Sequence, residues 1–179
     1  ESEIIPVFGT REALFNFPQY FLHDKQNPVM AFPNPFYQIY EGAATASRAK
    51  TKHMPLTKEN CFQTSLTPAQ MKEADLVIIN YPSNPTAANM SLEAMTQWVK
   101  DALEYDFVLL NDECYSEIYF DDKNKPVSLL EASIQAGNSE FKNILVINSI
   151  SKRSSAPGLR SGFIARDKTI LKGYLKYRT

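Results

Sequence analysis

Short, nearly continuous apolar runs recur along the chain, and each is followed by a polar or Gly/Pro-rich turn. Five of these runs predict strands, at residues 29–32, 75–80, 107–112, 143–148 and 161–165. Their Val, Ile, Leu and Phe residues are consecutive rather than alternating with polar ones, which is typical of strands buried on both faces of a parallel sheet. We therefore expect a sheet that is covered by helices.

The segment between the second and third predicted strands has the clearest helical spacing. Ser91 is a suitable N-cap, and Glu93 places negative charge in the first turn. Five apolar residues follow the spacing of a core-facing stripe: Met95, Trp98, Val99, Ala102 and Leu103. Further helices are predicted from Gly9 onward and over residues 36–49. This alternation of strand and helix predicts an α/β fold: a three-layer, open, mostly parallel sheet with helices on both faces.

Composition and charge narrow the class of protein. Lys+Arg 19 against Asp+Glu 20 gives a formal net charge of -1, without the basic excess that binding to nucleic acid or a membrane surface requires. No apolar stretch reaches membrane-spanning length. Cys61 and Cys114 form neither a disulfide framework nor a metal-ligand spacing. We therefore expect a reducing, cytoplasmic location and no bound metal.

Polar residues follow the predicted strands, where ligands bind in open parallel sheets. In chain order they are Asn84, Asp112, Tyr115, Ser149, Ser151, Lys152 and Arg160. The Gly9-Thr10-Arg11 turn at the start of a predicted helix adds free backbone N–H groups and a positive dipole end, which suit a phosphate group.

Each of these features alone has an ordinary explanation as a helix cap, a loop salt bridge or a surface lysine. Together they match one cofactor. Arg160 and Ser149 can clamp a phosphate. Asp112, at the end of a buried strand, needs a cation or several donors to stay ionised. Lys152, beside a cationic group in a partly dry site, can become an amine nucleophile. Pyridoxal phosphate requires this combination of groups.

Three segments, "YPSNPT", "NDECYSEIYF" and "SISKRSSAPGLRSG", resemble the cofactor motifs of class I, fold-type I pyridoxal-phosphate aminotransferases, in the same order. The resemblance covers essentially the whole chain. It implies that residues 1–179 are the cofactor-binding large domain, without the N-terminal segment and the C-terminal small domain of the family. It also implies a homodimer with an active site at its interface, so we expect the isolated chain to be inactive.

The resemblance assigns a role to each polar residue. Lys152 becomes the Schiff-base lysine and the proton carrier, and Asp112 pairs with the ring nitrogen. Tyr115 and Asn84 hydrogen-bond the phenolic oxygen, and Tyr37 stacks on the ring. The phosphate site comprises Gly9, Thr10 and Arg11, the last two through backbone N–H groups, with Ser149, Ser151 and Arg160.

Local wording such as "DECYSEIYFDD" most resembles N-succinyldiaminopimelate aminotransferases of lysine biosynthesis. That likeness implies amino transfer between N-succinyl-LL-2,6-diaminopimelate and 2-oxoglutarate. An aspartate-type aminotransferase, a C–S β-lyase and a non-catalytic phosphate-binding α/β module remain alternatives. Ser149 and Lys152 also fit S-x-x-K of β-lactamases, but the accompanying S-D-N and K-T-G are absent. Ala87 stands where the family usually has a glycine after Asn-Pro-Thr. The sequence does not decide whether the Arg153 side chain faces the substrate or the solvent.

Overall fold

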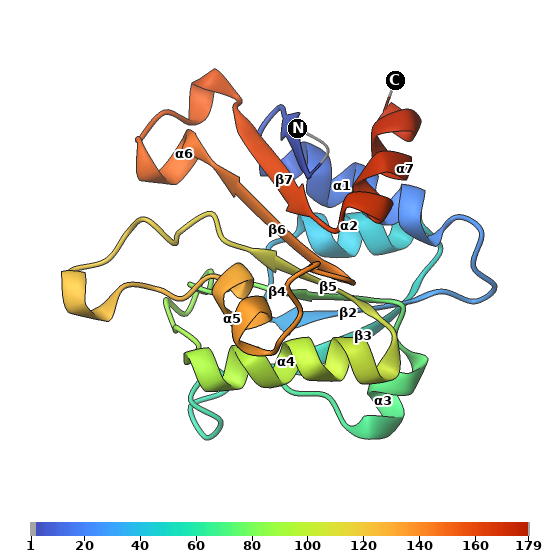
Figure 1. Cartoon of the computed structure of the whole chain (residues 1–179), viewed down its shortest axis with the longest axis horizontal. Helices are drawn as coiled ribbons and strands as arrows, with labels where there is room; N and C mark the ends of the chain where they lie inside the picture. Colours follow the sequence, from blue (N-terminus) through green and yellow to red (C-terminus); the bar gives the residue numbers. More distant parts are fainter. Residues whose placement is uncertain (1–2, 179) are drawn as a thin grey trace.

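A computed structural model describes residues 3–178 as one seven-stranded sheet (Figure 1). The strands are β1 (Ile4–Val7), β2 (Val29–Asn34), β3 (Lys50–Pro55), β4 (Leu76–Ile79), β5 (Val108–Asp112), β6 (Ile144–Ser149) and β7 (Gly162–Arg166). Their order across the sheet is β1-β7-β6-β5-β4-β2-β3. Only β7 runs against its neighbours, β6 and β1, and the other pairs are parallel. All five predicted strands are confirmed.

Helices cover both faces of this sheet. They are α1 (Thr10–Leu22), α2 (Ile39–Ala46), α3 (Pro68–Glu73), α4 (Leu92–Tyr105), α5 (Leu129–Gln135), α6 (Ile150–Arg153) and α7 (Lys168–Arg178), with 3-10 turns η1 (Asp122–Asn124) and η2 (Pro157–Leu159). Figure 1 shows α1, α2 and α7 on one face and α4 and α5 on the other. No helix in the described part of the chain is long and apolar enough to cross a membrane.

Alternate residues of the central strands fill two separate cores. In β4, Leu76 and Ile78 pack in the cluster that holds the buried residues of α1, α2 and α7. Val77 and Ile79 pack in the cluster that holds those of α4 and α5. A parallel strand buried on both faces has no polar face, because both sets of side chains lie in a core. The three-layer prediction is therefore confirmed.

Helix α4 has the predicted cap and stripe. The Ser91 hydroxyl accepts a hydrogen bond from the Ala94 N–H at 3.2 Å. The buried positions include Met95, Trp98, Val99 and Ala102. The helix ends where Asp106 takes a left-handed conformation, with φ 58°. Helix α4 crosses from β4 to β5 and so places the ends of these two strands side by side.

The strands at the edges of the sheet were not among the five predicted. In β3 only Met54 is buried, so this strand lacks the apolar run that marks the central strands. Strand β1 is four residues long and pairs only with β7 among the described strands. Neither omission affects the site. The parallel strands β4, β5 and β6 end at a common edge, where their following residues meet.

Candidate functional site

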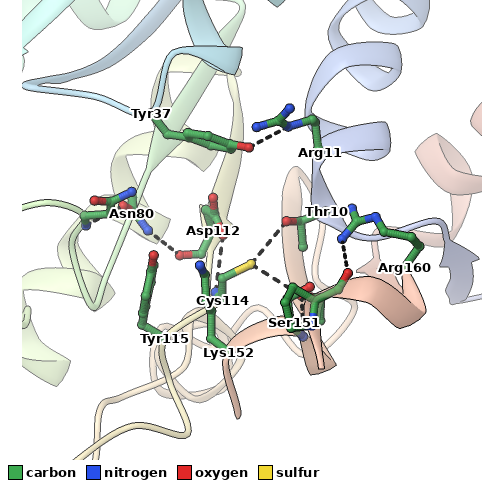
Figure 2. A pocket seen from close by; sticks show the side chains of 13 residues that line it. Thr10, Arg11, Tyr37, Asn80, Asp112, Cys114, Tyr115, Ser151, Lys152 and Arg160 are labelled. Atoms are coloured by element: carbon green, nitrogen blue, oxygen red, sulfur yellow. Dashed lines mark hydrogen bonds between the residues drawn. The ribbon is translucent and has the colours of Figure 1, made fainter. Parts of the chain in front are cut away.

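A cavity of about 450 Å³ opens at the carboxyl edge of β4, β5 and β6 (Figure 2). It is lined by Thr10, Arg11, Tyr37, Asn80, Asn84, Asp112, Cys114, Tyr115, Ser149, Ser151, Lys152, Pro157 and Arg160. Ten of the eleven residues expected from the sequence therefore line one cavity, and the eleventh, Gly9, directly precedes Thr10. Residues from five segments far apart in the chain meet here, so the predicted gathering at the strand ends is present.

Asp112 ends β5 at the floor of this cavity and is only 5% exposed. The Tyr40 hydroxyl donates to its Oδ2 at 2.9 Å, and the Cys114 N–H donates to Oδ1 at 3.3 Å. Burial raises the pKa of the Asp112 carboxyl, and these hydrogen bonds partly offset the rise. Burial also raises the pKa of Tyr40 well above its ordinary value, so its hydroxyl remains a donor. No ion pair within residues 3–178 involves Asp112, which leaves it suited to a cationic N–H group on a ligand.

Helix α1 begins at the opposite wall of the cavity. Gly9 precedes it with a φ of +75°, and Thr10 is its first residue. Thr10 Oγ1 lies 3.2 Å from Cys114 Sγ, which lies 4.0 Å from Ser149 Oγ. Burial raises the pKa of the Cys114 thiol, so it stays protonated and can donate to either hydroxyl. This chain of contacts fixes the helix N-terminus beside the ends of β5 and β6.

Arg160 lies directly over Gly9. Its Nη2 donates to the Phe8 carbonyl at 3.1 Å, and its Nη1 donates to the Pro157 carbonyl at 2.9 Å. A Cβ at Gly9 would overlap Nη2 and lie 2.7 Å from Cζ of Arg160. Glycine therefore serves two needs here, the left-handed backbone and the close approach of the guanidinium. The helix terminus and this guanidinium form a cradle for an anion.

Lys152 projects from α6, a single turn that sequence reasoning treats only as part of a loop. The Ser149 hydroxyl caps this turn by accepting from the Ser151 N–H at 3.2 Å. The Lys152 ammonium lies 5.6 Å from the centre of the Tyr115 ring. Lys152 and Arg160 are both exposed in this chain, so the partly dry surroundings expected for the lysine are absent among residues 3–178.

Arg11 has a wider role than the backbone contact expected from the sequence. Its Nε donates to the Tyr37 hydroxyl at 2.7 Å, and its Cζ lies 5.5 Å from the centre of the Tyr37 ring. The guanidinium thus fixes the tyrosine at the rim of the cavity, as Figure 2 shows. Arg153, whose role the sequence leaves open, instead pairs with Glu117 at 3.7 Å outside the cavity.

Asn84 reaches the cavity from the turn that follows β4. Its N–H donates to Asn80 Oδ1 at 2.8 Å, and Asn80 Nδ2 donates to the Asp112 carbonyl at 2.8 Å. Ala87 closes the turn by donating its N–H to the Ser83 carbonyl at 2.8 Å. Ala87 has a φ of 58°, a left-handed conformation that favours glycine. The departure from the family's glycine therefore leaves the turn, and the place of Asn84, intact.

The model of the family "Aminotransferase class I and II" matches residues 1–178. The chain belongs to this family. It is 30% identical to an LL-diaminopimelate aminotransferase of Natranaerobius thermophilus, over 100% of the chain and 45% of that protein. It is 31% identical to the LL-diaminopimelate aminotransferase of Aquifex aeolicus, over 99% of the chain and 45% of that protein. The crystal structure of aminotransferase AspB from Helicobacter pylori is 59% identical, with a TM-score of 0.96, over 99% of this chain and 47% of that one.

The chain thus spans less than half the length of these class I and II aminotransferases. The family part of the resemblance is confirmed. The two curated relatives are named for LL-diaminopimelate and not for its N-succinyl derivative. Their names therefore do not support the more specific resemblance to N-succinyldiaminopimelate aminotransferases.

Class I and II aminotransferases depend on pyridoxal phosphate. Two features of the cavity fit this group. Asp112 is a buried carboxylate without a cation, which suits a protonated ring nitrogen. The Gly9 cradle under Arg160 suits the phosphate. His, Cys, Asp and Glu residues form no group that could hold a metal ion within the part of the chain described.

Sequence reasoning missed three residues that complete the site. Tyr40 reads as core because it lies in an apolar helix stripe, yet its hydroxyl reaches Asp112 across 72 positions of the chain. In the sequence, Asn80 ends an apolar run and indicates only that a turn follows. Cys114 has no partner in the sequence that would mark it. The one available signal was position, since Asn80 ends one predicted strand and Cys114 lies two residues after the end of another.

Proposed function

We propose that the protein containing this chain is a pyridoxal-phosphate-dependent aminotransferase. The observation that carries the proposal is the buried, cation-free Asp112 in the same cavity as Lys152. Membership of the class I and II family supports it, because that family performs amino transfer with this cofactor. A phosphate-binding module without catalysis would need the cradle but neither of these two side chains.

Each wall of the cavity would hold one part of the cofactor. Asp112 would keep the proton on the ring nitrogen, with Tyr40 fixing the orientation of its carboxylate. Thr10 and Arg160 would bind the phosphate, together with Ser149 and Ser151 near the start of α6. Tyr37, held by Arg11, would cover one face of the ring.

The remaining polar groups would set the chemistry. The bound cofactor supplies an electron sink that weakens the bonds to the Cα of an amino acid. Asn84 and Tyr115 would donate to its phenolic oxygen. Lys152 would hold the cofactor through its Nζ and, once released, would carry the proton that leaves Cα. A lysine suits this task because its amine is mobile on a long side chain.

The substrate pair we propose is a diaminopimelate-class amino acid and 2-oxoglutarate, in lysine biosynthesis. The names of two curated relatives support the LL-diaminopimelate class. The wording of the cofactor motifs supports its N-succinyl derivative as the amino donor. A homodimer and a cytoplasmic location remain predictions.

The full-length protein, loaded with pyridoxal phosphate, tests the proposal. Glutamate formation from 2-oxoglutarate would be followed with LL-diaminopimelate, N-succinyl-LL-diaminopimelate and aspartate as donors, beside a Lys152→Ala control. We expect turnover with one of the first two donors and none in the control. Preference for aspartate would overturn the substrate class alone. Pyruvate release from cystathionine without amino transfer would indicate a β-lyase, and inactivity with every donor would contradict the proposal.

A further inference from the structure

Glu113 follows Asp112 directly and is also buried, with 6% exposure, but it does not line the cavity. Its Oε1 accepts hydrogen bonds from Asn111 Nδ2 at 3.1 Å, the Ser128 hydroxyl at 3.1 Å and the Leu129 N–H at 2.9 Å. Its Oε2 lies 3.1 Å from the same hydroxyl. Burying a carboxyl group in a core is costly, and here these hydrogen bonds offset the cost. None of them is made to a residue that lines the cavity.

One donor, Asn111, lies on a strand whose end borders the cavity, and the other two lie at the start of α5, away from it. Asn111 lies on β5 and also holds the backbone of Tyr81, accepting from its N–H at 3.1 Å and donating to its carbonyl at 3.4 Å. Tyr81 begins the turn that carries Asn84. Ser128 caps α5 by accepting from the Leu130 N–H at 3.2 Å. Glu113 therefore joins the end of β5, the turn after β4 and the start of α5.

The segment between Glu113 and Ser128 is a long excursion from the sheet, and we call residues 114–128 the β5–α5 loop. It carries Tyr115 near its start and ends at Ser128, where the Glu113 carboxyl binds it. Its tip is exposed, with Phe120 outside the core. A second attachment lies near Tyr115, where Asn148 Nδ2 donates to the Ser116 hydroxyl at 3.0 Å. Closing both ends of such a loop removes much of its conformational freedom.

We propose that Glu113 is a positioning residue of this site: its carboxyl group joins the two ends of the β5–α5 loop and so holds Tyr115 at the cavity. The inference rests on the proposed function, because Tyr115 acts there on the cofactor. Burial raises the pKa of Glu113 to about 7, with the nearby Glu131 adding to the rise. Both protonation states keep the contact, since a protonated Oε2 can donate to the Ser128 hydroxyl.

A purely structural role is the competing explanation. In that case loss of the carboxyl would lower stability without changing what Tyr115 does. The test therefore needs one measurement on the β5–α5 loop and one on the cofactor, to whose phenolic oxygen Tyr115 would donate. Glu113→Gln is the conservative variant, because its amide oxygen can accept from Leu129 and its NH₂ can donate to Ser128. Glu131→Gln is the matched control, because Glu131 is an exposed carboxyl on α5, the helix whose start Glu113 binds.

Both measurements use the full-length protein. In the cofactor-free protein, amide hydrogen exchange over residues 114–128 would be compared among parent, Glu113→Ala, Glu113→Gln and Glu131→Gln. In the loaded protein, the pKa of the cofactor's visible absorbance band would be titrated for the same variants, with and without Tyr115→Phe. If Glu113→Ala does not fold, Ser128→Ala replaces it, since it removes the hydroxyl partner and leaves the carboxyl in place.

We expect Glu113→Ala to speed exchange across the loop about tenfold and to raise the band pKa by about one unit, the equivalent of one lost hydrogen bond. Glu113→Gln should restore both, Glu131→Gln should change neither, and Tyr115→Phe should abolish the effect of Glu113→Ala on the band. An unchanged exchange rate, or faster exchange with an unchanged band, would overturn the inference. Absence of any band in the parent would instead contradict the proposed function.

Discussion

Replacing Gly9 with alanine should separate cofactor binding from folding. The new Cβ would overlap Nη2 of Arg160 and lie 2.7 Å from its Cζ, while Gly9 has a φ of +75°. Arg160 is exposed, so its guanidinium can swing away at little cost to the fold. It would then lose its contact with the Phe8 carbonyl and its place over the anion cradle.

The size of the effect follows from two separate losses. Alanine in the conformation of Gly9, with φ 75° and ψ 160°, costs about 1–3 kcal/mol of stability, because this region is essentially restricted to glycine. The displaced guanidinium would lose a charge-assisted hydrogen bond to the phosphate, about 1.5–3 kcal/mol, which is roughly a 10- to 100-fold weaker affinity for pyridoxal phosphate. Gly137→Ala is the matched control, because Gly137 has a φ of +80° and no atom within 4 Å of its Cβ position.

Titration of pyridoxal phosphate into the cofactor-free, full-length protein would give the two affinities, and thermal unfolding would give the two stabilities. We expect both variants to lose stability but only Gly9→Ala to bind pyridoxal phosphate more weakly. In an Arg160→Ala background the effect of Gly9→Ala on affinity should largely disappear. Equal affinities for Gly9→Ala and Gly137→Ala would refute the assignment of the cradle.

Three further substitutions test other parts of the account. Tyr40→Phe removes the hydrogen-bond donor to Asp112 Oδ2, so the Asp112 carboxyl should ionise less readily. Affinity for pyridoxal phosphate should then fall about tenfold in the same titration. Unchanged affinity would argue against a role of Tyr40 in the site. Gly162→Ala would place a Cβ 2.6 Å from a backbone carbonyl oxygen of β6, and thermal unfolding should show a loss of about 1–3 kcal/mol that Gly158→Ala, with open space around it, does not. Glu113→Gln should remove a pH dependence of stability: the pKa is raised from 4.5 to about 7 in the fold, so the carboxyl's contribution is full below pH 4.5 and is lost as pH rises through 7. The difference from the Gln variant should reach on the order of 3 kcal/mol in urea unfolding, and a flat difference from pH 4 to 8 would contradict that.

The fold was largely predictable because its central strands lie in two cores at once. Val77 and Ile78 face opposite helical layers, which leaves a run of apolar residues in the sequence. Edge strand β3 has only Met54 buried, so its sequence resembles a polar loop. The short helix α6 was missed for another reason, since four residues are too few to show a helical period.

The candidate site was predictable where position along a strand decides it. Asp112 and Ser149 are marked by the strands that they end, and the topology brings them together. Contacts made by side chains from other elements leave no such mark. The hydrogen bond of Tyr40 to Asp112 and the packing of Arg11 on Tyr37 depend on how α1 and α2 sit against the sheet, which the sequence pattern does not specify.

The central claim is that Lys152 holds pyridoxal phosphate in this cavity. The most direct measurement is borohydride reduction of the full-length protein loaded with the cofactor, followed by peptide mass mapping, with Lys152→Ala treated in parallel. We expect one reduced cofactor adduct, on Lys152, and a visible absorbance band that the variant lacks. An adduct spread over other lysines, with an equal band in Lys152→Ala, would contradict it.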